Sequence, residues 1–117
     1  MKAVLKHVGT PSCDFTPKTY QPIDYQSTAI LLDLEIGELN KDGADYFQLF
    51  VCTPEWLCKN HWQPEIIRHM LIVRKYNYDE IVKTINEYID KCSDENWEEI
   101  ANKLSRYFAW EFEDYQP

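Results

Sequence analysis

The clearest pattern in the chain is a pair of segments in which every second residue is apolar. Residues 29–39 follow this period-two pattern, which is typical of a strand with one buried face. Residues 45–53 repeat it, and the Asp42-Gly43 pair between the two segments suits the positive φ of a hairpin loop. We therefore predict an antiparallel hairpin, with residues 2–8 as a further short strand.

Two more segments complete the predicted sheet and its connections. The run 66–74 has apolar residues at neighbouring positions, which predicts a third long strand lying inside the sheet. Residues 54–57 begin with a proline and are expected to form a turn or a single helical turn. Residues 9–26 are broken by prolines, and a connection of this length is either a contact surface or poorly ordered.

The C-terminal third changes to a helical period. Asn77 followed by Glu80 forms a capping box, and an apolar stripe continues from there to Cys92. We predict a second helix capped by Ser93, with its stripe between residues 97 and 108. Strands first and helices last indicate one α+β domain over residues 1–117. We expect an antiparallel sheet of about four strands, with two C-terminal amphipathic helices packed on one face.

Composition limits the classes of function. The four cysteines lack C-x-x-C spacing and the histidines lack H-x-x-x-H spacing, so we expect reduced thiols, no metal and no cofactor. No apolar run is long enough for a membrane span, and charge interrupts the first residues too early for a secretory signal, so we expect a cytoplasmic location. A net charge of −8 disfavours nucleic acid and anionic membranes as partners and favours a basic protein.

Carboxylates are the main candidate functional groups. Asp33 and Glu35 are expected to project from one sheet face with their Cα atoms about 7 Å apart, a spacing that could serve glycoside hydrolysis. Alternating polar residues on a strand are more often its solvated face, and the chain lacks G-x-S-x-G and phosphate-loop motifs, so we do not expect an enzyme. A binding surface fits better, although an ordinary solubilising surface explains the same residues equally well. The predicted acidic patch comprises Asp33, Glu35, Glu38, Asp42, Asp45 and Glu55.

The last eleven residues are unusual for a chain end. Residues 107–117 contain five aromatic residues and three carboxylates, with no basic residue. Chain ends are usually small, polar and mobile, whereas aromatic side chains favour burial. Either this segment docks on its own domain or a partner covers it.

Three stretches carry a family resemblance. They are Phe50–Leu57 with its C-T-P-E-W turn, residues 71–78, and residues 97–115 with the sequence W-E-F-E-D-Y near their end. Over residues 27–115 the chain resembles the immunity protein 8 family, which consists of small cytosolic bacterial proteins encoded beside polymorphic toxin genes, including contact-dependent inhibition systems. The resemblance implies that the chain binds one cognate toxin C-terminal domain and neutralises it. The family supplies no catalytic residues.

The resemblance also bears on the aromatic residues and the tail. A family that neutralises varied toxins is expected to share architectural motifs, which implies that the tail docks on its own fold. The expected structural anchors are Trp56, Trp97, Trp110, Phe112 and Tyr115. The carboxylates left as a rim for a partner are Glu111, Glu113 and Asp114.

Our hypothesis from sequence is an α+β immunity protein that occludes a basic toxin domain. A nuclease toxin is expected on charge complementarity alone. One alternative is a generic acidic adaptor or inhibitor of another basic protein. A further alternative is a small enzyme that uses Asp33 and Glu35.

Overall fold

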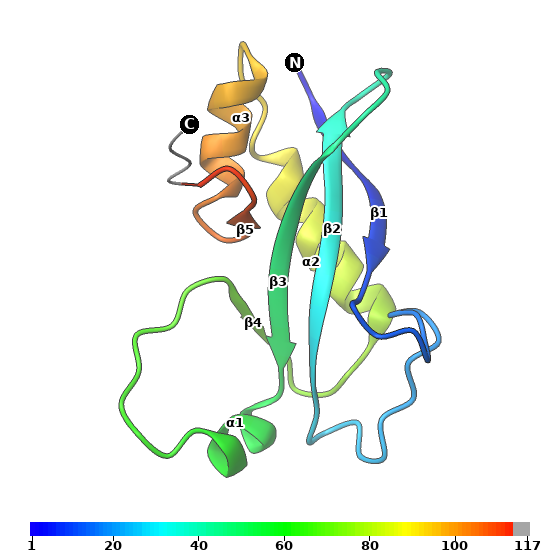
Figure 1. Cartoon of the computed structure of the whole chain (residues 1–117), viewed down its shortest axis with the longest axis vertical. Coiled ribbons are helices and arrows are strands. Elements are labelled where there is room, and N and C mark those ends of the chain that lie inside the picture. Colours follow the sequence, from blue (N-terminus) through cyan, green and yellow to red (C-terminus); the bar gives the residue numbers. More distant parts are fainter. Residues whose placement is uncertain (114–117) are drawn as a thin grey trace.

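The computed structural model describes residues 1–113, which form an open mixed sheet with the two C-terminal helices packed on one side (Figure 1). The elements are β1 (Ala3–Gly9), β2 (Ala29–Glu38), β3 (Asp45–Cys52), α1 (Pro54–Asn60), β4 (Met70–Ile72), α2 (Tyr78–Asp90), α3 (Trp97–Leu104) and β5 (Ala109–Trp110). The prediction of an α+β fold with two C-terminal helices is confirmed, but the sheet is mixed and not wholly antiparallel as predicted, because β4 pairs with β3 in parallel. No helix within residues 1–113 is long and apolar enough to cross a bilayer.

The sheet is built around the predicted hairpin, which is confirmed. β2 pairs with β3 antiparallel from Ala29 opposite Cys52 to Ile36 opposite Asp45, and β1 pairs antiparallel with the other side of β2. Gly43 in the hairpin loop has a φ of 90°, a conformation in which most side chains would be strained. The free edge of β3 is shared, because β4 pairs with it in parallel and β5 pairs with it antiparallel.

The core lies between one face of the sheet and the helices. Because side chains on a strand alternate, the even-numbered positions Leu32, Leu34 and Ile36 share a face and are almost completely buried. The stripes of α2 and α3 close this face with Ile81, Ile85, Ile89, Ile100, Ala101 and Leu104. In Figure 1, α2 crosses behind β1 and β2, and no helix of the described chain lies in front of these two strands. The opposite face of the sheet is open.

A strand does lie within residues 66–74, but its predicted length and its predicted place inside the sheet are wrong. β4 is only three residues long, and Ile66, expected inside the sheet, is fully exposed. The reason lies in the edge of β3, where β5 occupies Phe47 and Gln48 and leaves only residues 50–52 for β4. His69 has a φ of 62° immediately before β4, so extended structure cannot continue backward through it.

The helix starts follow their capping residues, and one prediction needs correction. α2 begins as predicted, with the Asn77 side chain accepting a hydrogen bond from Glu80 N at 3.1 Å. α3 begins after Asn96, whose side chain accepts from Glu99 N at 2.9 Å, and not after Ser93 as predicted. The Asn96 cap fits because its side-chain oxygen satisfies an amide of the first helical turn.

Candidate functional site

The uncovered face of the sheet is the candidate site because it presents polar and aromatic side chains that the core does not use. Asp33 and Glu35 alternate with the buried residues of β2, so both project away from the helices. By pairing register, Gln48 and Tyr46 of β3 and His7 of β1 stand beside them. We term this set the open sheet face: His7, Leu31, Asp33, Glu35, Tyr46, Gln48 and Phe50.

Cross-strand contacts hold the two carboxylates of the open sheet face. Gln48 Nε2 donates to Asp33 Oδ1 at 2.9 Å, and His7 Nδ1 lies 2.9 Å from Glu35 Oε2. The carboxylates therefore bond to neighbouring strands and remain partly exposed, with a third of the Glu35 side chain open to solvent. This arrangement presents two fixed acceptors that can receive hydrogen bonds from a partner.

The six acids grouped in the predicted patch do not lie together. Glu38 pairs in register with Ala3, and Asp45 with Ile36, so both belong to the helix-covered side of the sheet. Asp42 is exposed in the hairpin loop at one end of the sheet. Period two already separates odd from even positions along β2, so the alternation in the sequence could have placed Glu38 opposite Asp33 and Glu35.

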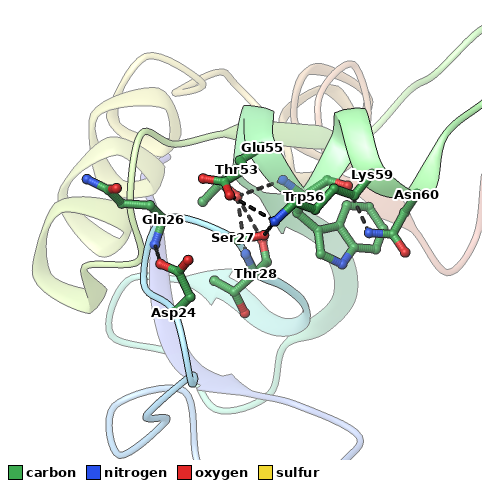
Figure 2. Close-up of polar contacts among 9 residues, drawn as sticks. All are labelled: Asp24, Gln26, Ser27, Thr28, Thr53, Glu55, Trp56, Lys59 and Asn60. Carbon is green, nitrogen blue, oxygen red and sulfur yellow. Dashed lines mark hydrogen bonds and ion pairs between the residues drawn. The ribbon is translucent and has the colours of Figure 1, made fainter.

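Glu55 lies on α1, which stands at the other end of the sheet (Figure 1), and Figure 2 shows its polar contacts. Thr53 Oγ1 caps this helix by accepting from Trp56 N at 3.3 Å, and it also accepts from Thr28 N at 3.2 Å, which ties α1 to the start of β2. Glu55 pairs with Lys59 at 2.9 Å, and this hydrogen bond raises the pKa of Lys59 above its ordinary value. Glu38 pairs similarly with Lys41 at 2.9 Å, so both acids are locally neutralised.

The C-terminal segment docks on the molecule's own sheet through Trp110. Its ring stacks on Phe47, with centroids 6.4 Å apart and planes 16° apart. Trp110 Nε1 donates to Asp45 Oδ2 at 3.0 Å, and Trp97 Nε1 donates to the same oxygen at 2.9 Å. Asp45 is therefore the shared acceptor of two indoles and holds the hairpin, α3 and β5 together.

The rest of the tail lies nearer the surface. Phe112 meets the Trp110 ring edge-on at 5.8 Å and keeps 46% of its surface exposed. Glu111 Oε1 accepts from Tyr46 N at 2.9 Å, while Glu113 pairs with Arg68 Nη2 at 2.7 Å. Two residues assigned to the tail site, Asp114 and Tyr115, lie outside the described residues.

Trp56 joins the open sheet face to the segment that follows α1. Its ring lies 5.4 Å from Phe50 of the open sheet face and 5.6 Å from the ring of His61. The aromatic surface of the sheet thus continues across α1 into residues 61–69, which we term the 61–69 loop.

The 61–69 loop carries exposed apolar residues that sequence reasoning missed. Trp62 is 84% exposed and Ile66 is fully exposed, while Ile67 remains more than a third exposed. We assigned residues 66–74 to a buried strand, which concealed this surface. No local signal separates this surface from a strand, because Pro64 precedes the apolar run over residues 66–74 and does not interrupt it.

The cysteines and the described acids show no metal-binding arrangement. Cys13, Cys52, Cys58 and Cys92 are free thiols, and burial raises the pKa values of Cys52 and Cys92. Within residues 1–113, no group of three or more His, Cys, Asp or Glu side chains could hold a metal ion.

Comparison with known proteins assigns the family. Searches against curated proteins and against solved structures found no match. The family model described as immunity protein 8 matches residues 3–115, which extends the match beyond the motif-bearing residues to include β1. The chain belongs to the immunity protein 8 family.

Proposed function

We propose that this protein neutralises one cognate toxin C-terminal domain in the bacterial cytoplasm by covering its basic substrate surface with the open sheet face. The toxin belongs to a contact-dependent inhibition or related polymorphic system and is a nuclease, and the protein acts as an inhibitor and not as an enzyme. The observation that carries the proposal is an uncovered sheet face bearing Asp33 and Glu35 in a member of an immunity protein family.

The chemistry of the open sheet face supports protein binding. Leu31 and Phe50 supply apolar area, and Tyr46 is 54% exposed, so an aromatic ring that can also hydrogen-bond stands at the surface. Specific interfaces combine an apolar centre with polar groups around it, and aromatic residues are enriched there. The paired strands make the face rigid, so binding orders few additional groups.

Charge supports a basic partner. The ion pairs of Glu38, Glu55 and Glu113 with lysine or arginine cancel locally. Asp33, Glu35 and Asp42 have no lysine or arginine partner among the described residues, so they contribute more of the outward negative field. A nuclease surface that binds phosphate is positively charged, and carboxylates can take the place of the phosphates.

Co-expression with the toxin domain encoded beside this gene tests the proposal. We expect the protein to restore growth and to co-purify with the domain. The Asp33→Asn/Glu35→Gln double variant should associate more slowly, with a weaker dependence on salt, because it removes charge from the proposed interface. Absence of both protection and complex would contradict the proposal. If the complex forms and the double variant associates as fast as wild type, the open sheet face is not the binding surface.

A further inference from the structure

The 61–69 loop is a fixed projection and not a loose connection. At its start, His61 Nδ1 lies 2.7 Å from Glu65 Oε2, which closes the first turn of the loop. At its end, Arg68 Nη2 donates to Ser105 O at 2.9 Å and pairs with Glu113 at 2.7 Å. His69 adds a contact of 3.2 Å between its Nε2 and Ser105 O. These contacts hold both ends while the middle of the loop faces solvent (Figure 1).

The exposed residues in the middle of this loop do not serve the fold. Trp62 is 84% exposed and Ile66 is fully exposed, so folding removes little of their surface from water. Single apolar residues on a surface are common, but a tryptophan and two isoleucines within six positions form a patch. Tryptophan is the residue most enriched at energetic centres of protein interfaces.

The position of the patch points to the partner of the open sheet face. Trp56 contacts Phe50 on that face and His61 at the start of the loop, so ring contacts link the open sheet face to the residue that precedes Trp62. Around the patch, Glu55 pairs with Lys59 and Glu113 with Arg68, whereas Asp33 and Glu35 of the sheet face have no lysine or arginine partner among the described residues. The surroundings of the loop are therefore less negative than the sheet face. A low-charge apolar patch beside fixed carboxylates fits an apolar pocket bordered by basic residues.

A second copy of the chain is a poorer occupant. The chain does contain an apolar hollow of about 220 Å³, whose lining includes Leu71, Tyr88 and Phe108. Two copies would however bring together two molecules that each carry a net charge of −8, and this repulsion opposes their association. A basic toxin domain is attracted by the same charge.

We propose that Trp62 and Ile66 of the 61–69 loop insert into an apolar pocket of the toxin domain and set the lifetime of the complex. This inference rests on the proposed function and divides the binding surface into two parts. The carboxylates of the open sheet face govern the rate of association, and the loop governs the rate of dissociation. The fixed ends of the loop reduce the conformational entropy that insertion would otherwise cost.

Association and dissociation rates with the toxin domain encoded beside this gene test the inference on the full chain. We expect Trp62→Ala to raise the dissociation rate and Kd by about 30-fold or more, with little change in the association rate. Ile66→Ala should raise Kd by about 10-fold, because it removes a smaller apolar side chain from the same pocket. Asp33→Asn/Glu35→Gln should show the reverse, with slower association and a smaller effect on dissociation.

The matched control is Leu39→Ala, which truncates another exposed apolar side chain beside the hairpin loop. It should change Kd by less than about 2-fold, since Leu39 lies outside the proposed surface. If wild type binds tightly and Trp62→Ala dissociates as slowly as wild type, the loop inference fails and the proposed function stands. If wild type does not bind the domain, both fail. If Trp62→Ala abolishes self-association in sedimentation and leaves toxin binding intact, the occupant is a second copy and the inference is overturned.

Discussion

Two aromatic segments of this protein, the 61–69 loop and the tail around β5, have opposite fates. Trp110 stacks on Phe47 and donates its indole N–H to Asp45, while Trp62 stands 84% exposed. Both segments contain little regular structure, and both combine tryptophan with glutamate. The difference lies in what the rest of the fold offers, because β3 gives β5 a strand to pair with and gives Trp110 a ring to stack on and a carboxylate acceptor. Aromatic content alone therefore does not separate an anchor from a contact residue.

The largest expected difference between the two segments is in stability. Trp110→Ala removes the stacked ring and leaves Asp45 with one indole donor, so we expect the free energy of unfolding to fall by about 3 kcal/mol. Urea denaturation at neutral pH measures this change. A loss below about 1 kcal/mol would mean that the tail is no better anchored than the loop.

The shared acceptor of the docked segment can be tested separately. Asp45→Ala leaves the indole N–H groups of Trp97 and Trp110 without their acceptor, and we expect a loss of about 1–3 kcal/mol. Asp45→Asn keeps an oxygen in the same place and should lose less. Equal losses in the two variants, compared by urea denaturation, would show that charge and not hydrogen bonding holds the tail.

Stability at alkaline pH gives an independent measure of how well the core excludes water, through the buried side chain of Tyr76 just before α2. Burial, together with the nearby Tyr20 and Tyr78, raises the pKa of Tyr76 from 10.0 to about 12. The folded protein therefore holds this proton more tightly than the unfolded chain. The resulting stabilisation is complete below pH 10 and is lost as pH rises from 10 to about 12.

Urea denaturation across this pH range measures the Tyr76 effect. Tyr76→Phe should be less stable at neutral pH, because it loses the hydrogen bond that the hydroxyl donates to Pro17 O. It should also fall less steeply with pH. Burial raises the pKa of Tyr88 as well, so part of the slope should persist in this variant. An unchanged slope would assign the whole effect to other groups.

The smallest expected effect completes the comparison. Trp62→Ala should change the free energy of unfolding by less than about 0.5 kcal/mol, because an exposed side chain makes few contacts that folding creates. Thermal melting of this variant beside Trp110→Ala would place both tryptophans on one scale. A large loss in Trp62→Ala would contradict the assignment of Trp62 to a partner-facing surface.

Local patterns predicted the parts of the fold that depend on neighbours in the sequence. The hairpin follows from alternation and the Asp42-Gly43 turn, and α2 follows from its Asn77 cap and apolar stripe. The strand over residues 66–74 failed because its length is set by β5, which arrives from nearly forty positions later and takes part of the β3 edge. Such competition between distant segments leaves no local pattern.

The candidate site was predictable in part. Asp33 and Glu35 were correctly assigned to one sheet face, since alternation alone determines that. The prediction grouped them with Asp45, whose carboxylate instead accepts from two partly buried indoles, and nothing near Asp45 in sequence indicates those donors. Trp62 was missed because apolar residues after it resembled a strand, and only tertiary structure shows which apolar residues lack a covering element.

The link between Trp110 and Asp45 also has a consequence for the order in which the chain folds. It joins positions 65 residues apart, so closing it costs more chain entropy than closing the hairpin, although the cost grows only logarithmically with length. β5 is therefore expected to form late and to open first when the native state fluctuates. Because Glu113 follows β5 and pairs with Arg68 at the base of the 61–69 loop, each such opening would remove one of the contacts that hold this end of the loop and leave those to Ser105 O. The stability of the β5 pairing thereby contributes to how firmly the loop that carries Trp62 is held.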